Sequence, residues 1–185
     1  MIESKEDWRA YVRADIEALG AKTRNVLWRT DNSMVWLTDS VARWERLLRC
    51  LEYWENCRGG RATKPYRVWL RWRFQRLSEH LGFSIPLNVC GPGLCILHYG
   101  SIVVSRHARI GARCTLNSCV NIGANPSGGG GGSHRDDVYI GSGVKVWNEV
   151  RIADGCTLGA NACVSKDVLT PGSVVVGANK VLDGV

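Results

Sequence analysis

The residues best suited to chemistry are the four histidines, at positions 80, 98, 107 and 134. Imidazole is the one side chain whose ordinary titration falls near neutral pH, which suits it to accept and return protons. His98 precedes a Tyr-Gly pair and an apolar segment, and His134 follows a run of glycines. The spacing leaves two interpretations open for each: His98 as a general base or a packed histidine, and His134 as a site residue or a solvated loop residue.

Thiols and glycines give weaker indications. Eight cysteines are present, but none forms a C-x-x-C pair and no His or Cys recurs at ligand spacing, so no metal site is predicted. The run of five glycines at 128–132 lacks the Lys-Ser/Thr of a phosphate-binding loop, which argues against nucleotide hydrolysis.

The element that must position these residues is a repeat with a period of six between positions 104 and 164. The aliphatic residues on it are Val104, Ile110, Leu116, Ile122, Ile140, Val146, Ile152, Leu158 and Val164. Four positions after an aliphatic stands a small or β-branched residue: Cys114, Val120, Val144, Val150, Cys156 and Ala162. A fixed short period predicts a solenoid. Six residues suit one short strand and a turn, so three such units would close a triangular coil with the aliphatics inside.

Three amphipathic helices are predicted before the repeat, over about 5–19, 40–57 and 65–81. Asp39 or Ser40 would cap the second, Gly20 would end the first and Gly82 the third. The buried side expected for the third helix is Tyr66, Trp69, Leu70, Leu77 and Leu81, with Phe74 nearby. A turn-rich segment at 83–93 follows. The expected organisation is therefore a helical region, 1–82, and a β-helix, 83–185, with an excursion loop at 124–137.

Composition restricts the partners and the compartment. The 185 residues are 45% hydrophobic and 22% charged, which is typical of a globular protein. Neither a membrane-spanning run nor an apolar signal core occurs, so a cytoplasmic protein is expected. Most of the net charge of +7 lies in residues 1–82, with 16 basic and 11 acidic residues.

The basic, Trp-rich third helix could be an interfacial helix. Packing against the β-helix or another subunit accounts for the same side chains, so membrane contact is not expected. Binding of nucleic acid would rest on the basic helices alone and is not expected either.

Two segments, 96–104 (ILHYGSIVV) and 133–141 (SHRDDVYIG), carry a resemblance to a family. With the six-residue repeat they resemble the left-handed parallel β-helix acyltransferases, and residues 83–177 are most similar to the serine acetyltransferase branch and to relatives that acetylate sugars. The resemblance implies an α+β chain in which helices precede a left-handed parallel β-helix. It also implies an O-acetyltransferase that uses acetyl-CoA.

The resemblance also implies roles for individual residues. His98 matches the catalytic base, and His134, with Arg135 beside it, matches the segment that orients the acceptor. The positions that would contact acetyl-CoA are Gly141, Ser142, Ala160, Asn161 and Lys166. No metal is implied. Family members assemble as trimers with sites between subunits, so a homotrimer, or a dimer of two trimers, is expected.

Three positions depart from the serine acetyltransferase pattern. Leu97 stands where an acceptor-binding Asp precedes the catalytic histidine, and Ser133 stands where an Arg pairs with the serine carboxylate. The stretch 84–90 lacks the Asp that orients the base, and Asn88 is its best polar substitute. A carboxylate acceptor would lose a bidentate contact without the Arg.

Three functions therefore stay open. The first is acetylation of serine or a serine-like small molecule. The second is acetylation of a sugar or a surface-polysaccharide precursor, which Leu97 and Ser133 favour. The third is a non-catalytic trimeric scaffold that uses its Trp-rich helices for interaction, since a fold alone does not require an activity.

Overall fold

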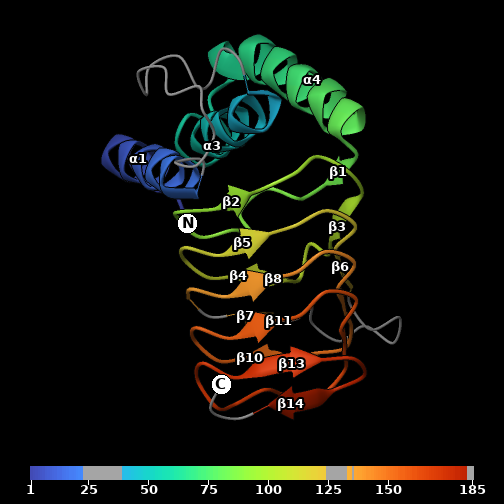
Figure 1. Ribbon diagram of the computed structural model, residues 1–185. Helices are drawn as coiled ribbons and strands as arrows, with labels where there is room; N and C mark the ends of the chain where they lie inside the picture. Colours follow the sequence, from blue (N-terminus) through green and yellow to red (C-terminus); the bar gives the residue numbers. More distant parts are fainter. Residues whose placement is uncertain (23–38, 124–132, 135, 183–185) are drawn as a thin grey trace.

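The computed structural model describes residues 1–22, 39–123, 133–134 and 136–182, with side chains left out at 21, 22, 133 and 134. Helices cover one end of an elongated β-helix (Figure 1). They are α1 (Lys5–Lys22), α3 (Ser40–Cys57) and α4 (Lys64–Leu81), and a 3₁₀ turn, η2 (Arg61–Thr63), precedes α4. The predicted order of helices followed by a parallel β-helix is confirmed.

The strands that follow are short. They are β1 (Phe83–Ser84), β2 (Cys95–Ile96), β3 (Ile102–Val104), β4 (Arg109–Ile110), β5 (Thr115–Leu116), β6 (Asn121–Ile122), β7 (Ser133–His134), β8 (Tyr139–Ile140), β9 (Lys145–Val146), β10 (Arg151–Ile152), β11 (Thr157–Leu158), β12 (Cys163–Val164), β13 (Val174–Val176) and β14 (Lys180–Leu182). Sheet 1 has the order β1-β3-β6-β9-β12, sheet 2 the order β10-β7-β4, and sheet 3 the order β14-β13-β11-β8-β5-β2. Every pair is parallel except β13–β14, which is antiparallel.

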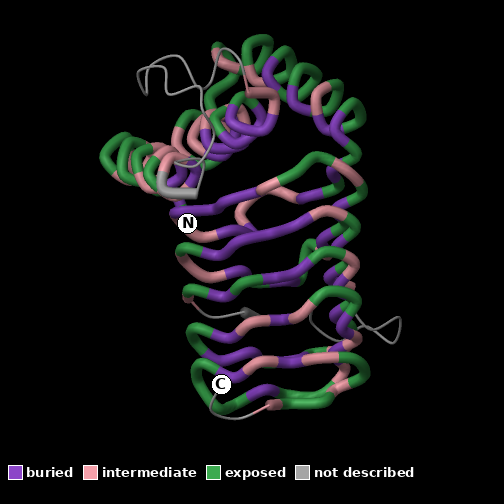
Figure 2. The backbone as a smooth tube through the Cα atoms, viewed as in Figure 1, coloured by how far each residue is buried: buried purple, intermediate pink, exposed green. Residues whose placement is uncertain are grey.

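The six-residue register forms the core. Each of the nine predicted aliphatics is buried, and so are the six small residues that follow them at the fourth position. Figure 2 shows the buried residues alternating with exposed ones down the coils. Because one inward residue per strand stacks on the next coil, the repeat buries a continuous column without long strands.

The helix ends follow local chemistry, with one exception. The Asp39 carboxylate accepts a hydrogen bond from the Val41 N–H at 2.7 Å and caps α3. Gly82 ends α4 in the left-handed conformation, with φ 78°. The predicted stop at Gly20 was wrong, because α1 continues to Lys22. A glycine inside a helix costs only about 1 kcal/mol, which neighbouring contacts can offset.

The predicted burial of α4 was wrong in part. Leu70, Phe74 and Leu81 are buried, but Tyr66 and Trp69 are exposed. The physical reason is that these two residues line an open groove between α3 and α4. Tyr66 contacts Trp54 of α3 there, at 4.7 Å between ring centroids, but solvent still reaches both side chains.

The open end of the β-helix is closed by acidic side chains from the helices. In the later coils, backbone N–H and C=O groups form hydrogen bonds with the neighbouring coils, but the first coil has no coil before it. Asp15 of α1 and Glu45 and Glu52 of α3 accept hydrogen bonds from its N–H groups. The donors, at 2.7–3.0 Å, are the amides of Asn88, Gly93, Leu94 and Ile96. An unsatisfied buried amide would cost about 1–3 kcal/mol.

Arg49 completes this layer. Its fully buried guanidinium donates to Asp15 at 2.8 Å and to Glu52 at 3.0 Å, and also to the carbonyls of Cys90 and Gly91. Burial lowers the pKa of Arg49, but the two carboxylates outweigh that effect and hold the pKa above its ordinary value. The cluster binds α1, α3 and the first coil into one unit.

Glu45 provides a pH-dependent prediction. Burial raises its pKa well above the ordinary range, and its second carboxylate oxygen has no hydrogen-bond partner among the described residues. A raised pKa in the folded state means that the carboxyl favours folding while protonated and opposes it as pH rises through its unfolded value toward its folded value. We therefore expect Glu45→Gln to raise the melting temperature at neutral pH, with the gain vanishing toward pH 4.

Thermal melts of the wild type and Glu45→Gln across pH 4–8 measure this difference in melting temperature. Each unit by which folding shifts a pKa corresponds to about 1.4 kcal/mol in the free energy of unfolding. Glu79→Gln, at an exposed position of α4, is the matched control. A gain for Glu45→Gln that is the same at every pH would contradict the prediction.

The two predicted regions share one core. A single hydrophobic cluster runs from Val41 and Leu48 in α3 to Val175 in β13. Division of the chain at residue 82 stays a prediction, and most of the predicted loop at 124–137 lies outside the described residues. None of the eight cysteines forms a disulfide. Among the described residues no helix is long and apolar enough to cross a bilayer.

Candidate functional site

His98 lies on one corner of the triangular β-helix. The turns that join sheet 3 to sheet 1 stack there and comprise residues 97–101, 117–120, 141–144 and 159–162. We call this column the His98 corner. Sheet 2 forms the face opposite it, because each coil passes from sheet 1 through sheet 2 to sheet 3 before it returns to this corner.

The backbone on both sides of His98 is fixed. The Leu97 N–H donates to the Leu116 carbonyl at 3.0 Å, and the Gly100 N–H donates to the Leu81 carbonyl at 2.9 Å. The His98 turn is thus held by the next coil and by the end of α4. His98 itself is exposed, and its side chain has no hydrogen bond or ion pair with the described part of the chain. The imidazole is therefore accessible to an acceptor.

Gly100 allows this turn to form. Its φ of +138° is rarely adopted by residues with a side chain, and a Cβ there would lie 3.2 Å from the Cβ of Ser118. We expect Gly100→Ala to cost about 1–3 kcal/mol of stability, since it places a strained backbone against a packed neighbour. Chemical denaturation measures the loss. Gly60→Ala is the matched control, because Gly60 has an extended backbone and no atom lies within 4 Å of the place that its Cβ would take. Equal stability of the two variants would contradict the expectation.

Four of the five predicted acetyl-CoA contacts share this corner. Gly141 and Ser142 form the turn after β8, and Ala160 and Asn161 form the turn after β11. Ser142, Ala160 and Asn161 are exposed. Gly141 permits close stacking, because a Cβ there would meet the Leu158 carbonyl oxygen at 2.8 Å. Small residues therefore leave space along the corner below His98, which suits an extended ligand.

The structure separates other predicted residues from this corner. Lys166 is exposed, but it lies in the turn from sheet 1 to sheet 2. Asn88 lies in the corresponding turn of the first coil, where its amide exchanges hydrogen bonds of 2.9 and 3.1 Å with that of Asn56. Asn88 is therefore not brought to His98 and instead joins the first coil to α3. Its predicted role at the acceptor site stays a prediction.

His134 lies on sheet 2, away from His98. The β7 backbone pairs in register with β4 and β10, so His134 stands between Ile110 and Ile152. Its side chain and the whole of Arg135 are outside the described residues. One chain alone thus holds the two histidines on opposite sides of the β-helix.

Leu97 has a structural role. It is half-buried against a small cluster formed by Leu19, Ala42 and Cys95. Sequence patterns did not reveal this cluster, because it joins α1, α3 and β2. The position that precedes the base therefore contributes apolar packing, and no acidic group stands there.

Buried polar groups elsewhere on the corner support its shape. The Asn117 side chain is buried and donates to the Tyr139 hydroxyl at 2.9 Å and to the Ile140 carbonyl. These bonds tie the second turn of the corner to β8. No group of three His, Cys, Asp or Glu that could hold a metal occurs among the described residues.

A scan against protein-family models finds no match. A curated relative, the serine acetyltransferase of Mycobacterium tuberculosis (strain ATCC 25618 / H37Rv), is 36% identical over 96 residues, which cover 50% of this chain and 41% of the relative. The chain thus matches less than half the length of that relative.

Solved structures give the same fold. The serine acetyltransferase of Neisseria gonorrhoeae in complex with serine has a TM-score of 0.73 and 22% identity, and the match covers 94% of this chain and 68% of that one. The soybean enzyme complexed with serine has a TM-score of 0.75 and 21% identity, with coverage of 96% and 70%. The isoform 3 enzyme of Entamoeba histolytica in complex with cysteine has a TM-score of 0.71 and 19% identity, with coverage of 96% and 61%.

The chain is similar to the serine acetyltransferases in sequence over half of its length, and it has their fold, N-terminal helices followed by a parallel β-helix, over nearly all of it.

Proposed function

We propose that the protein is an O-acetyltransferase that moves an acetyl group from acetyl-CoA to a hydroxyl, with His98 as the general base. The observation that carries the proposal is the exposed imidazole on a turn held from both sides, in a chain with this fold and this sequence relative. Acetyl-CoA supplies an activated thioester carbonyl. His98 takes the proton from the acceptor oxygen as that oxygen bonds to the carbonyl carbon, and returns it to the departing thiol sulfur.

The residues along the His98 corner support binding of acetyl-CoA. Ser142, Ala160 and Asn161 present small or polar groups to solvent below the base, and Gly141 is buried beside Ser142. Lys166 is on another corner, so its contact with a phosphate of acetyl-CoA requires the neighbouring subunit.

We infer further that the active unit is a homotrimer with sites between subunits. His98 and His134 are on opposite sides of one β-helix, so both can serve one acceptor only when two chains meet. A cytoplasmic location and a second layer of assembly, a dimer of trimers, are parts of the same proposal.

Subunit mixing tests the shared site. His98→Asn and His134→Asn chains would each release CoA far more slowly than the wild type. When they are unfolded together and refolded, some interfaces combine the intact His98 of one chain with the intact His134 of another. Partial recovery of CoA release supports a site between subunits. No recovery, despite mixed oligomers shown by mass spectrometry, would place the site within one chain.

The acceptor is proposed to be serine or a serine-like small molecule, in line with the sequence relative. A sugar or surface-polysaccharide precursor is the second candidate, and one observation favours it: position 97 is packed against helix residues and offers no carboxylate to an amino group.

CoA release from acetyl-CoA, measured with serine and with a panel of sugars, separates these acceptors. Release with serine supports the first, and release with a sugar alone supports the second. Failure to bind acetyl-CoA at all would overturn the enzymatic proposal in favour of a trimeric scaffold.

A further inference from the structure

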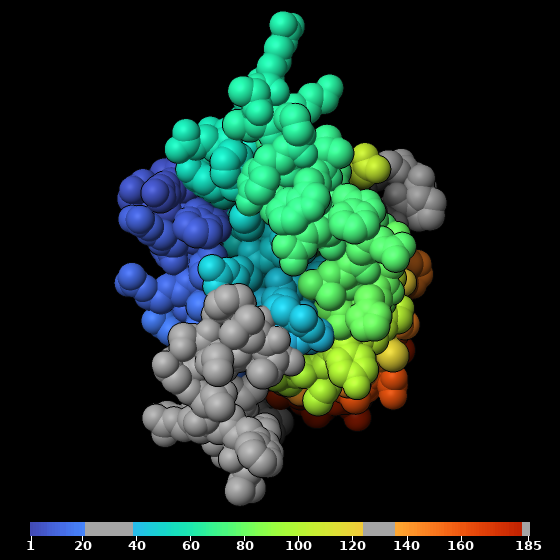
Figure 3. Space-filling model, turned by 90° about the horizontal axis from the view of Figure 1, so that it is seen from above, coloured from blue at the N-terminus to red at the C-terminus, as the bar shows by residue number. Residues whose placement is uncertain are grey.

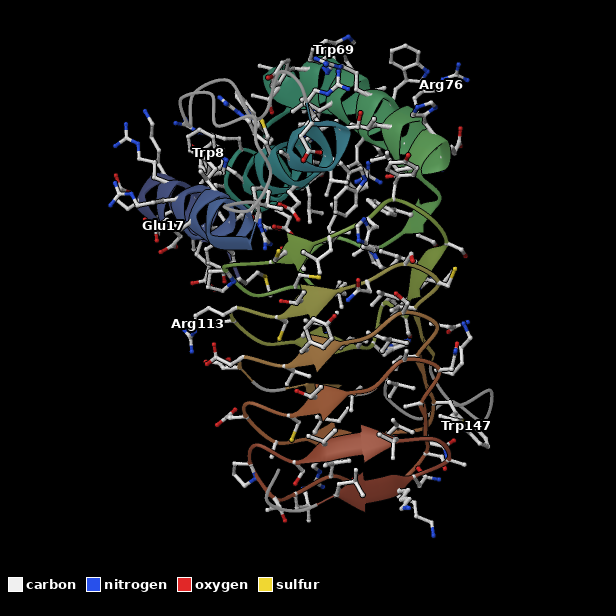
Figure 4. All side chains as sticks on the ribbon, viewed as in Figure 1. Trp8, Glu17, Trp69, Arg76, Arg113 and Trp147 are labelled. Carbon is white, nitrogen blue, oxygen red and sulfur yellow. The ribbon has the colours of Figure 1, made fainter. Side chains whose placement is uncertain are left out.

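Two tryptophans of α4 are largely exposed to solvent. Trp44 is fully buried, but Trp69 is 45% exposed and Trp72 is 60% exposed. Val68, at 58% exposed, belongs to the same helix. Figure 4 shows Trp69 and Arg76 on the outer side of α4, at the end of the molecule opposite the last coils. Packing against the β-helix therefore does not account for these side chains.

A groove of about 590 Å³ lies beside them, between α3 and α4. Its apolar lining includes Leu47, Leu70 and Leu77, and its basic lining includes Arg43, Arg73 and Arg76. The described residues that line it include no carboxylate. Figure 3 looks onto this end of the molecule, where α3 and α4 meet. We call the groove and the adjoining outer face of α4 the helical end surface.

The arginines of this surface differ in whether a carboxylate neutralises their charge. Arg67 and Arg71 each bind Glu55 at 2.8 Å. Arg73 and Arg76 form no ion pair within the described part of the chain, and the Arg73 guanidinium lies over the Trp69 ring at 4.9 Å. The surface therefore retains positive charge next to exposed aromatic rings.

Charge discriminates between the possible occupants. In a two-fold contact the same patch meets itself. Two copies of the helical end surface would bring Arg73 and Arg76 against arginines, without carboxylates in the groove to compensate them. An anionic partner gains from the same charges.

The aromatic residues indicate which anionic partner fits. Tryptophan is favoured where apolar hydrocarbon meets polar headgroups, and basic side chains there bind lipid phosphates. A helix with Trp on its outer side and Arg around it can lie in that layer without crossing it. Because α4 forms the end of the molecule, a flat surface can reach it without meeting the β-helix (Figure 1).

We propose that the helical end surface docks on an anionic phospholipid membrane, with Trp69 and Trp72 entering the headgroup layer and Arg43, Arg73 and Arg76 binding its phosphates. This peripheral contact places the β-helix and the His98 corner on the solvent side of the membrane. The inference does not depend on the proposed acetyl transfer.

Vesicle flotation of the full chain tests it, with vesicles of phosphatidylcholine alone and of phosphatidylcholine mixed with phosphatidylglycerol. We expect binding to the anionic vesicles only, and weaker binding as salt is raised. Arg73→Gln together with Arg76→Gln should reduce binding about 25-fold, since each basic residue near such a surface contributes about fivefold. Trp72→Ser should reduce it about tenfold, through the loss of buried aromatic area.

Matched control variants remove arginine and tryptophan side chains from other parts of the protein. Arg9→Gln together with Arg13→Gln removes two exposed charges from α1, and Trp147→Ser removes an exposed ring from the β-helix; both should bind like the wild type. Near-ultraviolet circular dichroism checks that every variant is folded.

Three outcomes would overturn the proposal. Equal binding to the two kinds of vesicle would exclude recognition of anionic lipid, and absence of binding would exclude docking. If the α4 variants change the oligomeric mass in light scattering and leave vesicle binding unchanged, the occupant is a second copy of the chain.

Discussion

Replacing His98 by asparagine is expected to lower the rate of acetyl transfer by about 10²–10⁴-fold, the usual contribution of a general base. Under the proposed function, the acceptor hydroxyl then has no group positioned to take its proton. Steady-state CoA release, with the acceptor identified by the panel described above, measures the loss. We expect it in kcat more than in the affinity for acetyl-CoA, because the small residues further along the corner are unchanged.

The structure makes this variant a clean test of chemistry. His98 is exposed and its side chain bonds to no described residue, so its replacement removes no packing. The melting temperature should stay the same. His107→Asn is the matched control, since His107 is also exposed but lies in a turn from sheet 1 to sheet 2. Full activity of His98→Asn would exclude His98 as the base, whereas equal losses in both variants would indicate a general effect on folding.

Replacing Arg49 by methionine is expected to destabilise the protein by about 3–5 kcal/mol, which is typical when one partner of a buried ion pair is removed. Asp15 and Glu52 would then stay buried without a compensating charge, and the carbonyls of Cys90 and Gly91 would lose their donor. The free energy of unfolding of a native domain is commonly only about 5–15 kcal/mol, so a loss of this size would remove a large part of it. Urea denaturation of the two proteins at neutral pH measures the difference.

Two further variants test whether the loss of stability in Arg49→Met comes from the buried charges. Arg113→Met breaks an exposed pair with Asp137 at 2.6 Å and should leave the stability close to that of the wild type, because water already screens such a pair. Adding Asp15→Asn to Arg49→Met should recover part of the stability, because the amide oxygen can still accept from the Gly93 N–H. A cost for Arg49→Met as small as that for Arg113→Met would show that the acidic layer does not depend on Arg49.

The buried polar layer formed by Asp15, Glu45, Arg49 and Glu52 also connects the fold to the proposed site. Glu45 accepts a hydrogen bond from the Ile96 N–H in β2, the strand that leads into the His98 turn. Leu81, the last residue of α4, accepts one from Gly100 on the other side of that turn. The helices thus position the candidate base, although none of their side chains is proposed to react.

Much of the architecture was predictable from local patterns. The six-residue period identified the inward column from Val104 to Val164, because each coil independently needs one apolar residue per strand. Asp39 and Gly82 were found for a similar reason, since capping acts within a few residues of a helix end. His98 was singled out by the resemblance that its segment carries; the structure places it on an exposed turn, and its role as the base stays a prediction.

Other features depended on residues far apart along the chain. Asp15 binds the amide of Gly93 and Asn88 binds Asn56, and neither pairing leaves a local pattern. The sequence by itself therefore determined the repeat, the helices and the candidate base. Only the tertiary structure decided which turns share the His98 corner, that His134 lies on the opposite side, and that Trp69 and Trp72 face outward. The physical reason is that a residue's corner and exposure depend on how whole coils and helices stack, whereas its period and its capping depend only on its immediate neighbours.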